Sequence, residues 1–98
     1  MHIKLEITDH LANITLSRPK VANALNAKML EELLHALRAA ADSPARVVRL
    51  CSSIDHFCAG ADINWMRDAI GGEKKDGHLE TLLLAEVLQT IWEMPKPV

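Results

Sequence analysis

The sequence predicts an α/β domain, and three patterns of side chains carry that prediction. Apolar residues alternate with polar ones between Ile3 and Leu16 and recur at helical spacing from Ala27 to about Ala41, and Val47, Val48 and Leu50 form a short apolar run without clean alternation. Alternation is typical of strands with one buried face, and a 3.6-residue period is typical of an amphipathic helix. A short β-branched run is typical of a strand covered on both faces. Strands and a helix in this order indicate the α/β class.

The chain is expected to open with a β-hairpin. Two segments place their apolar side chains at alternate positions: Ile3, Leu5 and Ile7 in the first, and Ala12, Ile14 and Leu16 in the second. Asp9-His10 between them is prone to form a turn, so we expect two antiparallel strands joined tightly.

A loop and a helix follow the hairpin. Pro19 has no N–H to donate to a strand ladder, so Arg18 to Leu25 should leave the sheet. Asn26 is available as an N-cap for the helix predicted from Ala27 to about Ala41, which Asp42-Ser43-Pro44 ends. The loop backbone is therefore free to contact a ligand.

The second half of the chain is predicted to be mostly helical. After the buried strand, Ser52 to Ala61 forms a turn-rich loop and Ile63 to Ala69 a short helix. Gly71 to Gly77 has the composition of a solvated, mobile segment. A long helix is expected from His78 to Glu93.

The apolar arc of that long helix is broader than a one-sided surface helix needs, so we expect cover on more than one side. Pro95-Lys96-Pro97 stops the helix, and Val98 has the character of the first residue of a further strand.

Composition excludes several classes of function. The net charge of -2 comes without a basic stripe, which argues against nucleic acid as a partner. No stretch has the roughly 18 apolar residues of a membrane span, and the start lacks the apolar core of a signal peptide. Cys51 and Cys58 are too few for a disulfide scaffold and fit a reducing compartment, so we expect a cytoplasmic protein. Their spacing with His56 is not that of a zinc site, and no metal is expected.

The stretch from Phe57 to Asp62 is the main candidate for chemistry. It joins the predicted strand to a helix through small residues, so backbone N–H groups can approach a ligand at the positive end of that helix. Such a turn suits an oxyanion. An ordinary strand-to-helix turn, with Gly60 in an unusual conformation and Asp62 as N-cap, explains the same residues.

Three segments, read in order, carry a resemblance to a known family: Arg18-Pro19-Lys20-Val21-Ala22-Asn23-Ala24-Leu25-Asn26, then Ala59-Gly60-Ala61-Asp62, then Met94-Pro95-Lys96-Pro97-Val98. With this order and spacing the whole chain resembles the crotonase (enoyl-CoA hydratase/isomerase) superfamily. The resemblance implies a spiral of strand-strand-helix repeats, assembled into trimers. Residues 1–98 would be the amino-terminal part of one such domain, ending before the second oxyanion-hole glycine and the catalytic glutamates.

The resemblance also implies roles for individual residues. The backbone N–H of Ala61 would be one of two donors to the oxygen of a coenzyme A thioester, which is the substrate; no prosthetic group is implied. Ala59, Ala61, Asp62 and Ile63 would line the path of the pantetheine and adenine. Lys20, Val21, Ala22 and Ala24 would hold the coenzyme A nucleotide.

By resemblance, the complete protein would bind acyl-CoA and add water across a 2,3 double bond, and this chain alone would be inactive. An enoyl-CoA isomerase shares every motif present, and a noncatalytic coenzyme A binding or assembly module is a third reading. The run Asp62-Ile63-Asn64-Trp65-Met66 is similar to hydratases of branched or carboxylated acyl-CoA, such as methylglutaconyl-CoA hydratase.

No general base is assigned within the chain. The glutamates of its second half match no catalytic motif and are interpreted as solvated charges: Glu73, Glu80, Glu86 and Glu93. A His56-Cys58 nucleophilic pair is a weaker reading than an inert small thiol at Cys58.

Overall fold

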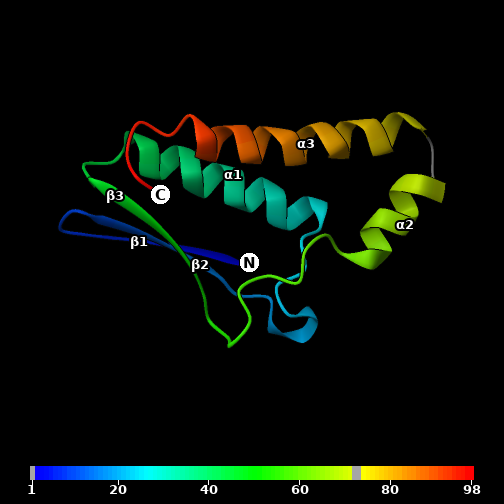
Figure 1. Ribbon diagram of the computed structural model, residues 1–98, viewed down its shortest axis with the longest axis horizontal. Helices are drawn as coiled ribbons and strands as arrows, with labels where there is room; N and C mark the ends of the chain where they lie inside the picture. The colour runs from blue at the N-terminus through cyan, green and yellow to red at the C-terminus, as the bar shows by residue number, and fades with distance from the viewer. Residues whose placement is uncertain (1, 72–73) are drawn as a thin grey trace.

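A computed structural model of the chain describes residues 2–71 and 74–98, and side chains outside 68–80. The elements in chain order are strands β1 (Ile3–Thr8) and β2 (Leu11–Leu16), the short 3-10 helix η1 (Pro19–Val21), helix α1 (Ala27–Asp42), strand β3 (Val47–Ser52), and helices α2 (Ile63–Gly71) and α3 (Lys74–Trp92). A sheet, then α1, then α3 form three layers, with α2 at one end (Figure 1). The α/β class is confirmed.

The sheet has the order β1-β2-β3. β1 pairs antiparallel with β2, and Asp9 in the turn between them has a φ of 49°, so the predicted hairpin is present. β3 pairs parallel with β2, with Leu11 opposite Val47. A parallel pair needs a long crossover, and α1 supplies it.

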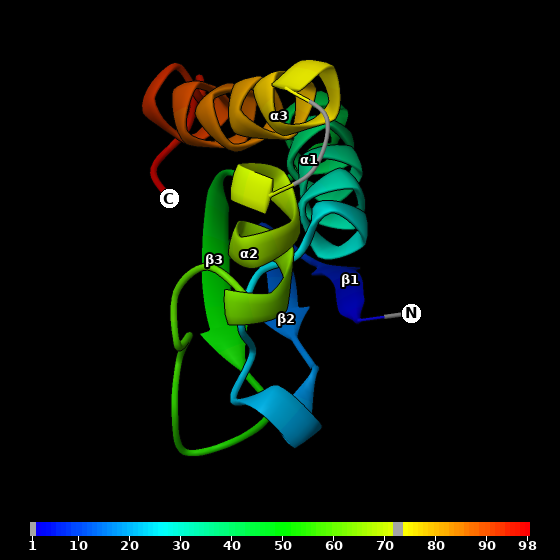
Figure 2. The same ribbon diagram turned by 90° about the vertical axis from the view of Figure 1, so that its right-hand side faces the viewer.

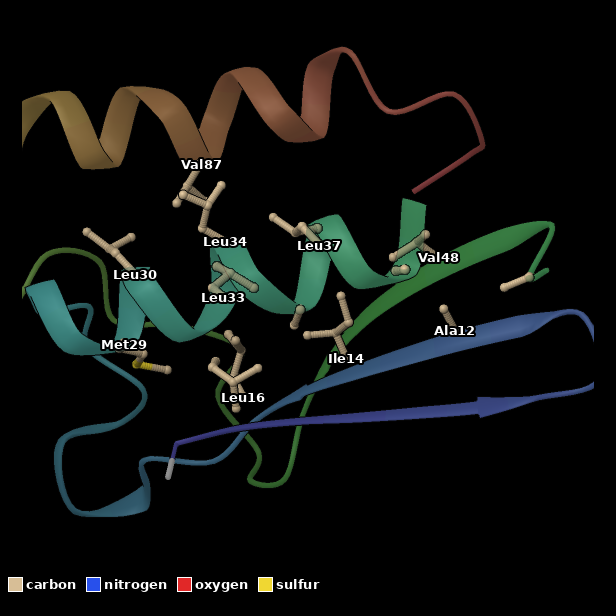
Figure 3. Packing of buried hydrophobic residues seen from close by; sticks show 14 residues of the cluster. Ala12, Ile14, Leu16, Met29, Leu30, Leu33, Leu34, Leu37, Val48 and Val87 are labelled. Carbon is tan, nitrogen blue, oxygen red and sulfur yellow. The ribbon is translucent and has the colours of Figure 1, made fainter. Parts of the chain in front are cut away.

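The core lies between the sheet and α1. Ala12, Ile14 and Leu16 all point to this side, because alternate residues of β2 share one face. α1 covers them with a stripe at helical spacing, which Figure 3 shows: Met29, Leu30, Leu33, Leu34 and Leu37. From α3, Val87 closes the cluster above Leu34.

Side chains bond backbone groups at both ends of α1, where the helix itself leaves N–H and C=O groups without partners. The predicted N-cap is confirmed, because the side chain of Asn26 accepts from Met29 N at 2.9 Å. At the other end, Lys96 Nζ donates to the carbonyl oxygens of Ala40 at 2.9 Å and Ser43 at 3.0 Å. No pattern in the sequence indicates this role for Lys96.

Two expectations about the elements are wrong. The first concerns β3, which the described residues cover on one face and not on both: Val48, on the face toward α1, is 1% exposed, whereas Val47, on the opposite face, is 43% exposed. The second concerns the segment 71–77. α2 extends to Gly71 and α3 begins at Lys74, so Gly77 is helical, while Gly72 and Glu73 lie outside the described residues. One glycine inside a helix costs only about 1 kcal/mol, which the rest of a long helix offsets.

The apolar arc of α3 is covered on one side alone. Val87 is 1% exposed, whereas Leu88 is 58% and Trp92 88% exposed. The expected cover on a second side is not supplied by the described residues. Among them, no helix combines the length and apolar character that crossing a membrane requires.

Candidate functional site

The loop before α1 and the segment before α2 lie side by side, as Figure 2 shows. Three backbone hydrogen bonds join them. Ala59 N donates to Ala22 O at 3.0 Å, Leu25 N to Gly60 O at 2.7 Å, and Asp62 N to Leu25 O at 2.7 Å. Segments more than thirty residues apart in the sequence thus form one structural unit.

This pairing orients the backbone of Ala61. Leu25 and Ala61 form a parallel bridge in which Leu25 bonds the neighbours of Ala61, namely Gly60 and Asp62. The N–H of Ala61 therefore points to the opposite side, and among the described residues it donates to no protein acceptor. Gly60 has a φ of 91°, which only glycine adopts at little cost.

A hollow of about 380 Å³ lies at this turn. Its lining is small or apolar apart from two side chains, and consists of Val21, Ala24, Ala59, Ala61, Asp62, Ile63 and Asn64. Six of the eight residues predicted to bind coenzyme A are in this set. Of the other two, Lys20 is exposed on η1, and Ala22 has a φ of 52° and accepts from Ala59.

A larger hollow of about 600 Å³ lies between β1 and α1. It shares no lining residue with the turn. We place the candidate site at the smaller hollow because a free backbone donor there supplies specific chemistry, which volume alone does not.

Asp62 fixes the start of α2. Its carboxylate accepts from Trp65 N at 3.1 Å, so the predicted N-cap is confirmed. The same carboxylate pairs with Arg18 at 2.9 Å, and the guanidinium also donates to Ala24 O at 2.7 Å. The hydrogen bond from Trp65 N–H and the bond from Arg18 hold the pKa of Asp62 below its ordinary value. Arg18 is thereby committed to the loop.

Asn23 is the residue at this site that the sequence reasoning missed. It is fully buried, and its side chain bonds Arg18 N, Ser52 Oγ and Phe57 O. Its residue type could have indicated a structural role, because an asparagine inside a Pro-containing loop is suited to positive φ and local hydrogen bonding. The partners themselves come from distant parts of the chain.

The remaining candidates have structural surroundings. Cys58 Sγ donates to Asn23 O at 3.2 Å and accepts from Gly60 N at 3.3 Å, and both cysteines are free thiols. Glu86 pairs with Arg38, and Glu93 accepts from Gln89 at 3.0 Å. Glu73 lies outside the described residues, as does the side chain of Glu80. Within the described part of the chain, no group of three or more His, Cys, Asp or Glu could hold a metal ion.

The turn thus presents a backbone N–H without a protein acceptor among the described residues, beside a hollow lined mostly by small or apolar residues, and comparison with known proteins identifies the family. The family described as "Enoyl-CoA hydratase/isomerase" matches residues 6–98. The chain therefore belongs to the enoyl-CoA hydratase/isomerase family, and the predicted membership in the crotonase superfamily is confirmed.

Individual relatives agree with this assignment. A probable enoyl-CoA hydratase of Rhodobacter capsulatus is 42% identical over 98% of this chain and 36% of its own length. Human enoyl-CoA delta isomerase 2 is 30% identical over 92% of this chain and 23% of its own length. The chain thus spans about a third or less of these relatives.

Solved structures support the fold. The crystal structure of a putative enoyl-CoA hydratase/isomerase (crotonase) from Legionella pneumophila superposes with a TM-score of 0.90 at 29% identity, over 98% of this chain and 38% of that one. An enoyl-CoA hydratase from Bacillus anthracis gives a TM-score of 0.86 at 29% identity, over 100% of this chain and 38% of that one. The crotonase-like fold is therefore confirmed for the part present.

Proposed function

We propose that this chain binds the thioester end of an acyl-CoA and that the N–H of Ala61 donates to the thioester oxygen. The observation that carries the proposal is the backbone pairing at the turn, which occupies the N–H groups of Gly60 and Asp62 and leaves that of Ala61 free beside a hollow. Small residues line that hollow, so a carbonyl group can approach the backbone closely.

The chemistry of the proposed site follows from charge. Adding water to a 2,3-unsaturated thioester builds negative charge on the carbonyl oxygen. A preorganised N–H donor stabilises that charge and lowers the barrier by about 3 kcal/mol. Residues 1–98 would form the amino-terminal part of an enoyl-CoA hydratase domain, with the second donor and the acid/base groups supplied by other residues. On this proposal the chain by itself shows no turnover.

The nucleotide of the ligand would follow the loop that carries η1. Val21 and Ala24 line the hollow, and the exposed Lys20, which precedes Val21 in the chain, is available to a phosphate. Asp62 would contribute through its backbone and position, because its carboxylate is bound to Arg18 and Trp65. Ile63, which is 68% exposed at the rim, would cover the pantetheine.

Semisynthesis tests the donor directly. Ligation at Cys58 joins fragments 1–57 and 58–98, so lactic acid can replace Ala61 and turn its amide into an ester without an N–H. Calorimetry would give the affinity for crotonyl-CoA, and isotope-edited infrared spectroscopy the thioester C=O stretch. We expect the all-amide chain to lower the stretching frequency on binding.

The ester chain should lose most of that shift and about fivefold in affinity, the equivalent of one net hydrogen bond of about 1 kcal/mol. Free coenzyme A, which has no acyl carbonyl, is the matched control ligand and should bind both chains equally. A frequency shift that persists in the ester chain would show that another group contacts the carbonyl.

An isomerase is the second candidate, favoured by the similarity to an enoyl-CoA delta isomerase over 92% of the chain. Hydratases and isomerases both require an oxyanion donor, so the Ala61 experiment holds for either. Assaying the full-length protein with 2,3- and 3,4-unsaturated acyl-CoA would separate them. A noncatalytic module is favoured only by the exposed apolar side chains of α3, and turnover by the full-length protein would exclude it.

Three finer proposals concern the complete protein. We expect a preference for branched or carboxylated acyl-CoA, such as methylglutaconyl-CoA, which competition against crotonyl-CoA would measure. We expect a homo-oligomer built on trimers, which light scattering would detect. We expect a cytoplasmic location, which fractionation of the source cells would test.

A further inference from the structure

Asn23 joins the two segments that line the hollow. Its Oδ1 accepts from Arg18 N at 2.7 Å, within its own loop. Its Nδ2 donates to Ser52 Oγ at 2.8 Å and to Phe57 O at 3.0 Å, at the end of β3 and the start of the turn. The residue is 0% exposed, so water cannot replace these partners.

The two segments are joined along the whole turn, and between its two ends Ala59 N donates to Ala22 O at 3.0 Å and Cys58 Sγ to Asn23 O at 3.2 Å. Leu25 bonds Gly60 and Asp62 at the far end of the turn, and Asn23 bonds Phe57 at its near end. The Ala61 N–H lies in the same peptide plane as Gly60 O, which accepts from Leu25 N at 2.7 Å, so its direction follows the position of the turn relative to the loop. Gly60 itself, with a φ of 91° and no atom within 4 Å of a Cβ position there, does little to restrain the turn. Fixing both ends of the turn therefore restricts the directions that the N–H can take.

We propose that Asn23 is a positioning residue for the Ala61 donor, because its buried amide fixes the start of the turn relative to the loop that carries Val21 and Ala24. The inference rests on the acyl-CoA binding proposed above. Asn23 contacts no ligand itself and acts through the backbone of Phe57 and, across the turn, on Ala61.

Asparagine meets the hydrogen-bonding and conformational requirements of position 23. The site needs a donor toward Phe57 O and an acceptor from Arg18 N on one short side chain, and an amide supplies both. It also needs a φ of 59°, which asparagine adopts more readily than most residues. An aspartate has the same shape but, when ionised, would face Phe57 O with a second acceptor.

The test uses variants that separate hydrogen bonding from conformation and from stability. Asn23→Gly removes the side chain and keeps access to positive φ. Ser52→Ala removes one partner and leaves the bond to Phe57. Ile14→Val removes one methyl group from the core and serves as a control that lowers stability without touching either segment.

Two readouts report on the donor and not merely on folding. In the ligand-free protein, the ¹H and ¹⁵N chemical shifts of the Ala61 amide should move in Asn23→Gly, less in Ser52→Ala, and stay within the error in Ile14→Val. With labelled crotonyl-CoA, Asn23→Gly should lose at least half of the carbonyl frequency shift while its affinity for free coenzyme A changes less than twofold.

The outcomes distinguish this inference from the function it rests on. If the native chain neither binds crotonyl-CoA nor shifts its carbonyl, the proposed function is wrong, and the ligand-free Ala61 amide shifts still judge the role of Asn23. If the native chain shows the carbonyl shift and Asn23→Gly retains it with an unmoved Ala61 amide, Asn23 has no positioning role. If Asn23→Gly does not fold, Ser52→Ala decides by the same two readouts.

Discussion

Replacing Lys96 by methionine should destabilise the chain far more than replacing the exposed Lys4 by methionine. The ammonium of Lys96 donates to the carbonyls of Ala40 and Ser43 at the end of α1, at 2.9 and 3.0 Å. The following residue, Pro97, accepts from Val48 N at 2.8 Å on the outer edge of β3. Lys96 therefore ties the end of α1 to the segment beside the sheet.

The magnitude follows from these bonds. Methionine keeps the apolar stem of the side chain and removes all donors. Hydrogen bonds to a charged group contribute about 1.5 kcal/mol or more each, and a cation near a helix C-terminus adds about 0.5 kcal/mol. Because Lys96 is partly exposed, water recovers part of this, and we expect a net loss of about 2 kcal/mol.

Urea unfolding followed by circular dichroism measures the loss. With an m value of about 1.3 kcal/mol/M for a domain of this size, the midpoint should fall by about 1.5 M. Lys4→Met is the matched control. The side chains of the Lys4–Glu6 pair are 69% and 54% exposed, so losing this pair should change the free energy of unfolding by under about 0.5 kcal/mol. Equal midpoint shifts for the two variants would refute the proposed role of Lys96.

Three further predictions concern the site and the core. Asn23→Ala should be about 1 kcal/mol less stable than Asn23→Gly in urea, because alanine is strained at a φ of 59°; equal stabilities would remove the conformational argument. The pKa of Asp62 is lowered from 3.8 in the folded state, so its stabilisation is complete above that value and is lost as the pH falls through the lowered pKa. Thermal melts should therefore show a shallower acid-side decline for Asp62→Asn, and parallel curves would contradict this. Leu37→Ala should cost about 3 kcal/mol, because the side chain is 0% exposed in the core; a loss under about 1 kcal/mol would mean that the core collapses around the gap.

Local patterns account for most of the fold. The alternation around Ile14, the helical period through Leu33 and the cap at Asn26 all depend on neighbours within a few residues, and the structure confirms each of them. One error arose where a neighbouring layer decides the result. Val47 is β-branched and apolar, yet it is 43% exposed because nothing in the described chain packs on that side of β3.

The site was predictable in part. A small-residue turn with Gly60 and a capping Asp62 can be recognised from residue types, and the resemblance pointed to the N–H of Ala61, which stays a prediction. The structure adds the physical reason for choosing that N–H over its neighbours, since Leu25 occupies one of them and Cys58 the other. Sequence patterns could not show this, because the pairing joins segments that are not local to each other.

The sequence by itself determined most of the secondary structure, the N-caps and the family, because periodicity, N-cap chemistry and short motifs are properties of nearby residues. The tertiary structure alone decided which backbone groups remain free at the turn and which side chains hold it. Asn23 and Phe57 are 34 residues apart, and Lys96 and Ala40 are 56 apart. Hydrogen bonds over such separations exist only after the chain has packed, so a backbone donor with no protein partner can be identified only in the folded state.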